Sequence, residues 1–227
     1  MNIVTRAAVA QPAGVSIARD ARGLESFRDP ACAATIWDRE MPSDVISWLD
    51  ELASEVLPNG RAALQAQAVS HTVLRLCNIA GMPNGWQRDW LIADIADLAR
   101  RFADLMQVAY VRLRLRAVTT NACRKFHLDA ITGRLVCTYR ATGTQYGTSM
   151  RGEDPEHIFT APTGAPILLR GSLWPPNPTV GLLHRSPRLR GRGKPVSSSF
   201  LTQSLIRRTR SERKSWAKQL ATETALQ

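Results

Sequence analysis

The segment CRKFHLDAITGRLVCTY, which spans residues 123–139, contains the two patterns that decide the fold. Its second half, Arg134–Tyr139, is rich in apolar and β-branched residues and predicts a β-strand. Its first half contains His127 and Asp129 with one residue between them. Because alternate side chains of a strand point to the same face, these two side chains can converge on one point.

Further strands are predicted on both sides of this segment. Residues Val111–Arg116 alternate strictly between apolar residues and arginine, as in a half-buried strand whose arginines face solvent. Two later apolar runs, Ile167–Arg170 and Val180–His184, predict further short strands. The second half of the chain is therefore expected to form an antiparallel sheet.

Two helices are expected before these strands. Pro42, Ser43 and Asp44 predict a helix start near Ser43, and a Pro-Asn-Gly sequence at residues 58–60 ends that helix. Residues Trp86–Met106 place apolar side chains at helical spacing and predict a longer helix. Helices followed by a run of short strands indicate the α+β class.

The chain has four histidines, and two of them fit a metal site. His71 lies in a strand-like run without a nearby carboxylate, and His157 lies in a polar loop, so neither is expected to bind a metal. His127 shares a face with Asp129, and His184 ends a later predicted strand. Two imidazoles and one carboxylate form a facial triad, which fills three positions of an octahedral iron site. His127, Asp129 and His184 are therefore the candidate metal ligands, and the alternative is that both histidines are core or loop residues.

These motifs resemble a bacterial family catalogued as domain of unknown function 1826. The resemblance covers about Trp37 to Lys194 and is carried by Cys123–Asp129, Arg134–Tyr139, Gly143–Tyr146 and His184–Pro187. The motif order is similar to that of iron(II)/2-oxoglutarate oxygenases. This similarity implies N-terminal helices packed on a double-stranded β-helix of the jelly-roll or cupin type, with Fe(II) and 2-oxoglutarate as cofactors. Members often occur near zinc-homeostasis genes, which implies a non-catalytic zinc-binding module as the alternative function.

The oxygenase pattern implies three further residues at the cofactor site. Lys194 lies ten positions after His184, where a basic residue would pair with the remote carboxylate of 2-oxoglutarate. Arg134 and Tyr139 lie on the strand after the His-x-Asp motif and would line the same pocket.

The residues after Lys194 depart from the oxygenase pattern. Pro195–Phe200 is a poor strand sequence, so the final strand is expected to be missing or altered. One explanation is a change of reading frame near Pro195. The codons GTC TCC TCC TCG TTC would encode Val196–Phe200, and in the neighbouring frame, after a C, the same bases read Arg-Leu-Leu-Leu-Val.

The net charge of +11 is concentrated at the C-terminal end. Residues 1–183 contain 19 basic and 17 acidic side chains, and residues 184–227 contribute the remaining +9. A near-neutral body, and a basic end with few aromatic residues, argue against nucleic acid as the partner.

The composition also indicates the cellular compartment and the domain organisation. No window is apolar enough for a membrane helix, and the four cysteines form no CxxC pair, so a cytoplasmic protein is expected. We expect a poorly ordered lead-in over residues 1–35, one domain over residues 36–194 and a basic tail over residues 195–227.

Overall fold

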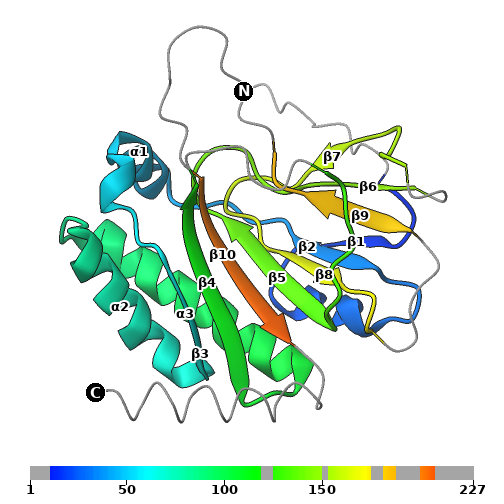
Figure 1. The fold of residues 1–227 in the computed structure, drawn as a ribbon, viewed down its shortest axis with the longest axis horizontal. Helices are drawn as coiled ribbons and strands as arrows, with labels where there is room; N and C mark the ends of the chain where they lie inside the picture. Colours follow the sequence, from blue (N-terminus) through cyan, green and yellow to red (C-terminus); the bar gives the residue numbers. More distant parts are fainter. Residues whose placement is uncertain (1–10, 119–124, 150–152, 175–180, 188–199, 208–227) are drawn as a thin grey trace, which may run out of the picture.

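A computed structural model describes residues 11–118, 125–149, 153–174, 181–187 and 200–207 of the chain (Figure 1). The helices within these residues are α1 (Ser43–Glu51), α2 (Val69–Ala80) and α3 (Trp86–Met106), with short 3-10 turns η1 (Arg22–Arg28), η2 (Ser54–Val56) and η3 (Ala66–Ala68). The α+β class expected from the sequence is confirmed. None of the described helices is long and apolar enough to cross a membrane.

The predicted helices at Ser43 and at Trp86–Met106 are confirmed, although the first ends at Glu51 and not at residues 58–60. The expected strand-like run around His71 is wrong. That run lies in α2, whose buried residues Val69, Val73 and Cys77 recur every four positions. The β-branched residues of this segment are typical of a strand, whereas the spacing of its buried residues is typical of a helix. Gly81 ends α2 in the left-handed conformation, with φ of 71°.

Within the described residues the strands form a seven-stranded and a three-stranded sheet. The larger sheet has the order β1-β2-β8-β5-β10-β4-β3, and all of its pairs are antiparallel except β1 with β2. Its strands are β1 (Val15–Ala18), β2 (Ala34–Trp37), β3 (Gly60–Gln65), β4 (Tyr110–Val118), β5 (Gly133–Thr138), β8 (Ile167–Arg170) and β10 (Phe200–Arg207). The smaller sheet has the order β7-β6-β9, with β6 at Gln145–Thr148, β7 at Phe159–Thr160 and β9 at Leu182–Arg185.

Alternation along β5 gives the larger sheet two different faces. Leu135 and Cys137 belong to a core that also contains α3 residues such as Leu98, and Figure 1 shows α3 running along one side of the sheet. Val136, between them, belongs to a second core shared with Tyr146 of β6. The larger sheet therefore has helices on one face and the smaller sheet on part of the other.

Two expectations for the ends of the chain are corrected. The expected disordered lead-in contains β1, η1 and the start of β2, and residues 1–10 lie outside the described part. The Arg170 guanidinium holds this region, because it donates to the carbonyls of Phe27, Asp29 and Pro30 and lies 4.5 Å from the centre of the Trp174 ring. These contacts come from distant parts of the sequence, so local composition does not reveal them.

The expected loss of the final strand is wrong. Phe200–Arg207 forms β10, which pairs with β4 on one side and with β5 on the other. The poor strand sequence at Pro195–Ser199 lies in residues 188–199, outside the described part, and the strand begins immediately after it.

Candidate metal centre

The backbone places the two candidate histidines directly opposite each other. His127 and His184 form an antiparallel bridge between the segment before β5 and strand β9. The amide of His127 donates to the carbonyl of His184 over 3.1 Å, and the reverse hydrogen bond measures 3.0 Å. Opposite residues of an antiparallel pair point to one face, so both imidazoles lie together, with Asp129 two residues farther on.

The side chains of these three residues meet. The ligand atoms of His127, Asp129 and His184 all lie within 4.8 Å of one another. Asp129 Oδ1 lies 3.6 Å from His127 Nε2, and Asp129 Oδ2 lies 3.2 Å from His184 Nε2. The two imidazole ring centres are 4.6 Å apart. One cation could therefore contact all three side chains.

The protonation states suit metal ligands. Burial lowers the pKa of the His184 imidazole, although Asp129 acts in the opposite direction, so the ring is neutral near pH 7. Burial tends to raise the pKa of the Asp129 carboxyl, but His184 and the Arg134 guanidinium outweigh burial, and this pKa lies below its ordinary value. The site therefore offers a carboxylate and at least one neutral imidazole, as divalent metals require.

Two buried atoms support the fit of a metal. Within the described residues, His184 Nε2 and Asp129 Oδ2 are inaccessible to solvent and form no hydrogen bond, although Asp129 Oδ2 lies 2.8 Å from the Arg134 guanidinium in an ion pair. Buried polar atoms are normally satisfied, and a cation bound to both atoms would satisfy them here.

The orientation of His127 is set by its other ring nitrogen. Nδ1 lies 3.0 Å from the carbonyl of Lys125, which can only accept a hydrogen bond. A proton on Nδ1 can be donated to this carbonyl, which leaves Nε2, on the side of Asp129, as the ring nitrogen available to a metal. Sequence reasoning missed this contact because a backbone carbonyl leaves no signal in residue types.

The backbone also holds Asp129 in place. Its carbonyl accepts a hydrogen bond of 2.9 Å from the amide of Ser172, in the segment that follows β8. A Cβ atom at Gly171 would lie 2.0 Å from the carbonyl oxygen of Ile131 and 2.7 Å from that of Asp129. Glycine is therefore required for this close approach.

A cluster on the opposite side of the same strands supports the two histidines. The residues next to them, Phe126 and Arg185, contact each other, with the guanidinium 4.2 Å from the ring centre. Arg185 Nε also donates to Gln145 Oε1 over 2.8 Å, which connects β9 with β6. These positions were not singled out from the sequence, although both are neighbours of candidate ligands.

Of the two expected cofactor residues that the structure describes, Arg134 lies at the triad and Tyr139 does not. Arg134 forms a 2.8 Å ion pair with Asp129 Oδ2. Tyr139 lies on the helix side of the larger sheet, where its hydroxyl donates to Asp94 Oδ2 over 2.8 Å. Arg39 binds the same Asp94 carboxylate through both terminal nitrogens, so Tyr139 belongs to a network that connects α3 to the sheet. Lys194 lies outside the described residues.

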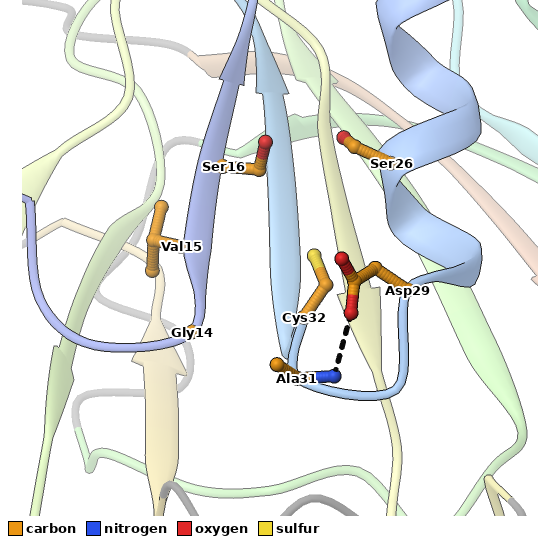
Figure 2. Close-up of a pocket in the computed structure, with 7 residues that line it drawn as sticks. All are labelled: Gly14, Val15, Ser16, Ser26, Asp29, Ala31 and Cys32. Carbon is orange, nitrogen blue, oxygen red and sulfur yellow. Dashed lines mark hydrogen bonds between the residues drawn. The ribbon is translucent and has the colours of Figure 1, made fainter.

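A separate hollow lies between β1, β2 and η1 (Figure 2). It has a volume of about 220 Å³, and it is lined by Gly14, Val15, Ser16, Ser26, Asp29, Ala31 and Cys32. The thiol of Cys32 donates to the carbonyl of Ala34 over 3.1 Å, and burial raises its pKa. Such a thiol is a poor nucleophile, so this hollow is a weaker candidate for a functional site than the triad.

A family model described as "Protein of unknown function (DUF1826)" matches residues 18–195 of the chain. The chain belongs to the DUF1826 family. The resemblance stated from the motifs around His127 and His184 is thereby confirmed. No curated protein matches this DUF1826 chain.

Several solved structures are similar to this DUF1826 protein at low identity. Dioxygenase for auxin oxidation 1 from Arabidopsis thaliana, in complex with 2-oxoglutarate, has a TM-score of 0.46 and 11% identity, covering 87% of this chain and 92% of that one. A full-length protein from Neurospora crassa, in complex with alpha-KG and thymine, has a TM-score of 0.40 and 12% identity, with coverage of 90% and 87%. A prolyl-4-hydroxylase from Pseudomonas putida has a TM-score of 0.32 and 12% identity, with coverage of 75% and 97%.

Proposed function

We propose that this DUF1826 protein is a cytoplasmic, metal-dependent oxygenase of the iron(II)/2-oxoglutarate type. The observation that carries the proposal is the convergence of His127, Asp129 and His184 within 4.8 Å. Two imidazoles and one carboxylate are the donor set of non-heme iron(II) oxygenases, and they leave the remaining positions of an octahedral ion open. The two facing sheets are consistent with a double-stranded β-helix around this centre.

The proposal assigns roles to five of the chain's own residues. His127, Asp129 and His184 would hold Fe(II), which supplies the redox chemistry with dioxygen and a position for the cosubstrate. Arg134 orients the Asp129 carboxylate and places a positive charge beside the site. Lys194, ten residues after His184, remains the proposed partner of the remote carboxylate of 2-oxoglutarate.

Metal and cosubstrate titrations test this proposal. The purified protein should bind one Fe(II) per chain, and 2-oxoglutarate should bind only when the metal is present. Asp129→Ala and His184→Ala should weaken metal binding by at least about 100-fold, since even loss of a residue behind a ligand costs about 10- to 100-fold. His157→Ala, in an exposed loop, is the matched control and should bind metal as the unmodified protein does.

Two results would contradict the oxygenase. Zinc binding at the triad without any binding of 2-oxoglutarate would favour the non-catalytic metal-binding module. Equal metal binding by Asp129→Ala and by the unmodified protein would exclude the triad as the metal site.

A further inference from the structure

Arg170 is a buried charge on the helix side of the larger sheet. It ends β8 and is only 5% exposed. Leu168 belongs to the core that contains α3, whereas Leu169 belongs to the second core, so alternation places Arg170 on the helix side. Arg134, which contacts Asp129, is directly opposite Leu169 and lies on the other face. Any effect of Arg170 on the triad must therefore pass through the backbone.

The N-terminal part of the chain binds this guanidinium. One terminal nitrogen donates to the carbonyls of Phe27 and Asp29, and the other donates to that of Pro30. The guanidinium carbon lies 5.4 Å from the centre of the Phe27 ring and 4.5 Å from that of the Trp174 ring. A buried charge is costly unless hydrogen bonds satisfy it, so these contacts fix the side chain in one position.

The residues that follow Arg170 hold the segment that carries the candidate ligand Asp129. Three consecutive amides donate to carbonyls of residues 129–132, and the pairs are Gly171 with Thr132 (3.0 Å), Ser172 with Asp129 (2.9 Å) and Leu173 with Ile131 (3.1 Å). The amide of Trp174 then donates to the carbonyl of Gly171 over 3.1 Å. Segment 170–174 is therefore bound to the guanidinium at both ends, through Arg170 itself and through the Trp174 ring.

The contact between these two segments leaves little room for adjustment. A Cβ atom at Gly171 would lie 2.0 Å from the carbonyl oxygen of Ile131, so the two backbones are already in close contact. A shift of segment 170–174 would therefore move Asp129 with it. The side chains of a binding site must keep their positions to within about 0.5 Å, so such a shift would reduce metal affinity.

We infer that Arg170 is a positioning residue of the candidate metal centre, which fixes Asp129 by anchoring segment 170–174 on the carbonyls of residues 27–30. The inference rests on the proposed function only in that the triad binds a divalent metal, and it needs neither 2-oxoglutarate nor a reaction. It also gives the N-terminal segment around η1 a role in metal binding, although the three candidate ligands lie far from it in sequence.

Titration of the full chain with Co(II), followed by visible absorption, tests the inference. Arg170→Gln should weaken Co(II) binding by about 10- to 100-fold, as for other residues behind a ligand. The absorption of the saturated variant should also differ from that of the unmodified protein, because a displaced Asp129 changes the coordination geometry. Unchanged affinity and absorption in Arg170→Gln would overturn the inference.

Arg170→Lys provides a second test that does not depend on the folding of Arg170→Gln. It keeps the charge and a buried donor, but one nitrogen replaces the two that bind the carbonyls. We expect Co(II) binding to weaken by about 10-fold, the lower end of the same range. If Arg170→Gln does not fold, unchanged affinity in Arg170→Lys would overturn the inference.

Arg140→Gln is the matched control. Arg140 is also buried, with 8% exposure, and it donates to the carbonyls of Leu52 over 2.7 Å and of Asp50 over 3.0 Å, at the end of α1. This variant loses comparable hydrogen bonds away from the triad, so it should keep the Co(II) affinity and absorption of the unmodified protein. Equal losses of Co(II) affinity in folded Arg140→Gln and Arg170→Gln would overturn the inference, because they would show a general effect of destabilisation.

Amide hydrogen exchange of the metal-free protein separates this inference from the proposed function. The amides of residues 171–173 should exchange at least about 10-fold faster in Arg170→Gln than in Arg140→Gln, because their segment has lost its anchor. Equal exchange would overturn the inference and leave the oxygenase proposal intact. Co(II) binding that depends on Arg170, without any binding of 2-oxoglutarate, would refute the oxygenase and leave the inference intact.

Discussion

The orientation of a candidate metal-binding histidine depends on the atom that its second ring nitrogen contacts. In His127 this atom is the carbonyl oxygen of Lys125, only two residues away. The ring is thus oriented by the local backbone rather than by a second carboxylate. This arrangement places few demands on the identity of residue 125, because any residue supplies the same carbonyl.

Tyr139 provides a test at the residue scale, because the motif resemblance and the structure give it different surroundings. Tyr139→Phe removes the hydroxyl that donates to Asp94. We expect the free energy of unfolding to fall by about 1 kcal/mol. Binding of metal and 2-oxoglutarate should not change. Denaturant unfolding and isothermal titration measure the two effects, and weaker 2-oxoglutarate binding would restore the role expected from the motif.

The segment after β8 carries a prediction at the element scale. Gly171→Ala would place a methyl group against the carbonyls of Ile131 and Asp129, and the segment that carries the carboxylate must move. We expect metal affinity to fall by about 10- to 100-fold, as for other changes behind a ligand, and stability to fall by about 1–3 kcal/mol.

Gly143→Ala is the matched control for that prediction. Its methyl group would lie 2.0 Å from the carbonyl of Ala161, so it produces a comparable steric conflict away from the triad. This variant should lose stability and keep its metal affinity when both proteins are folded. Equal losses of metal affinity in the two variants would show that overpacking acts on the whole fold.

The elements that sequence reasoning predicted are those with strong local patterns. The apolar period of α3 and the alternation of β4 are visible in the residues themselves, and both elements form where expected. Strand β1 has only four residues and pairs with β2, which in turn pairs with β8. The formation of β1 therefore depends on contacts with residues that are distant in sequence. Pairings of this kind do not appear in local composition.

The candidate site was predictable for a related reason. His127 and Asp129 are two residues apart in sequence, and the period of a strand predicted that they converge. In the structure they do converge, but His127 forms an isolated bridge and Asp129 lies outside the named strands. The pairing of His127 with His184 joins segments 57 residues apart, and it was expected only because His184 ends a strand. The roles of Ser172 and Gly171 are carried by backbone contacts and could not be inferred from residue types.

At the scale of the whole molecule, buried thiols report on the integrity of the fold. Burial raises the pKa of Cys77 to about 11 and that of Cys137 to about 12, and it also raises the pKa of Cys32. At pH 8 a thiol with a pKa of about 11 is ionised in about one molecule per thousand, and only the thiolate reacts rapidly. In a Cys123→Ser background, iodoacetamide should label the native protein very slowly and the unfolded protein at all three sites. Rapid labelling of the native protein would show that these cores open readily.

The suggested change of reading frame near Pro195 also applies to the whole molecule and stays a prediction about the gene. It fails if the codons for Val196–Phe200 cannot encode Arg-Leu-Leu-Leu-Val in the neighbouring frame. A frame-restored protein should have a higher thermal midpoint, because the sequence that leads into β10 would then be more apolar and could bury more surface. Equal midpoints for the two proteins would count against the idea.

The position of β10 has a consequence for how the protein is made. This strand follows all other described strands along the chain, yet it lies between β4 and β5. During synthesis these two strands must wait with unpaired edges until residues 200–207 have emerged from the ribosome. The nascent chain is therefore exposed to misassociation until β10 has emerged, and chaperones would have their greatest effect on its yield in that interval.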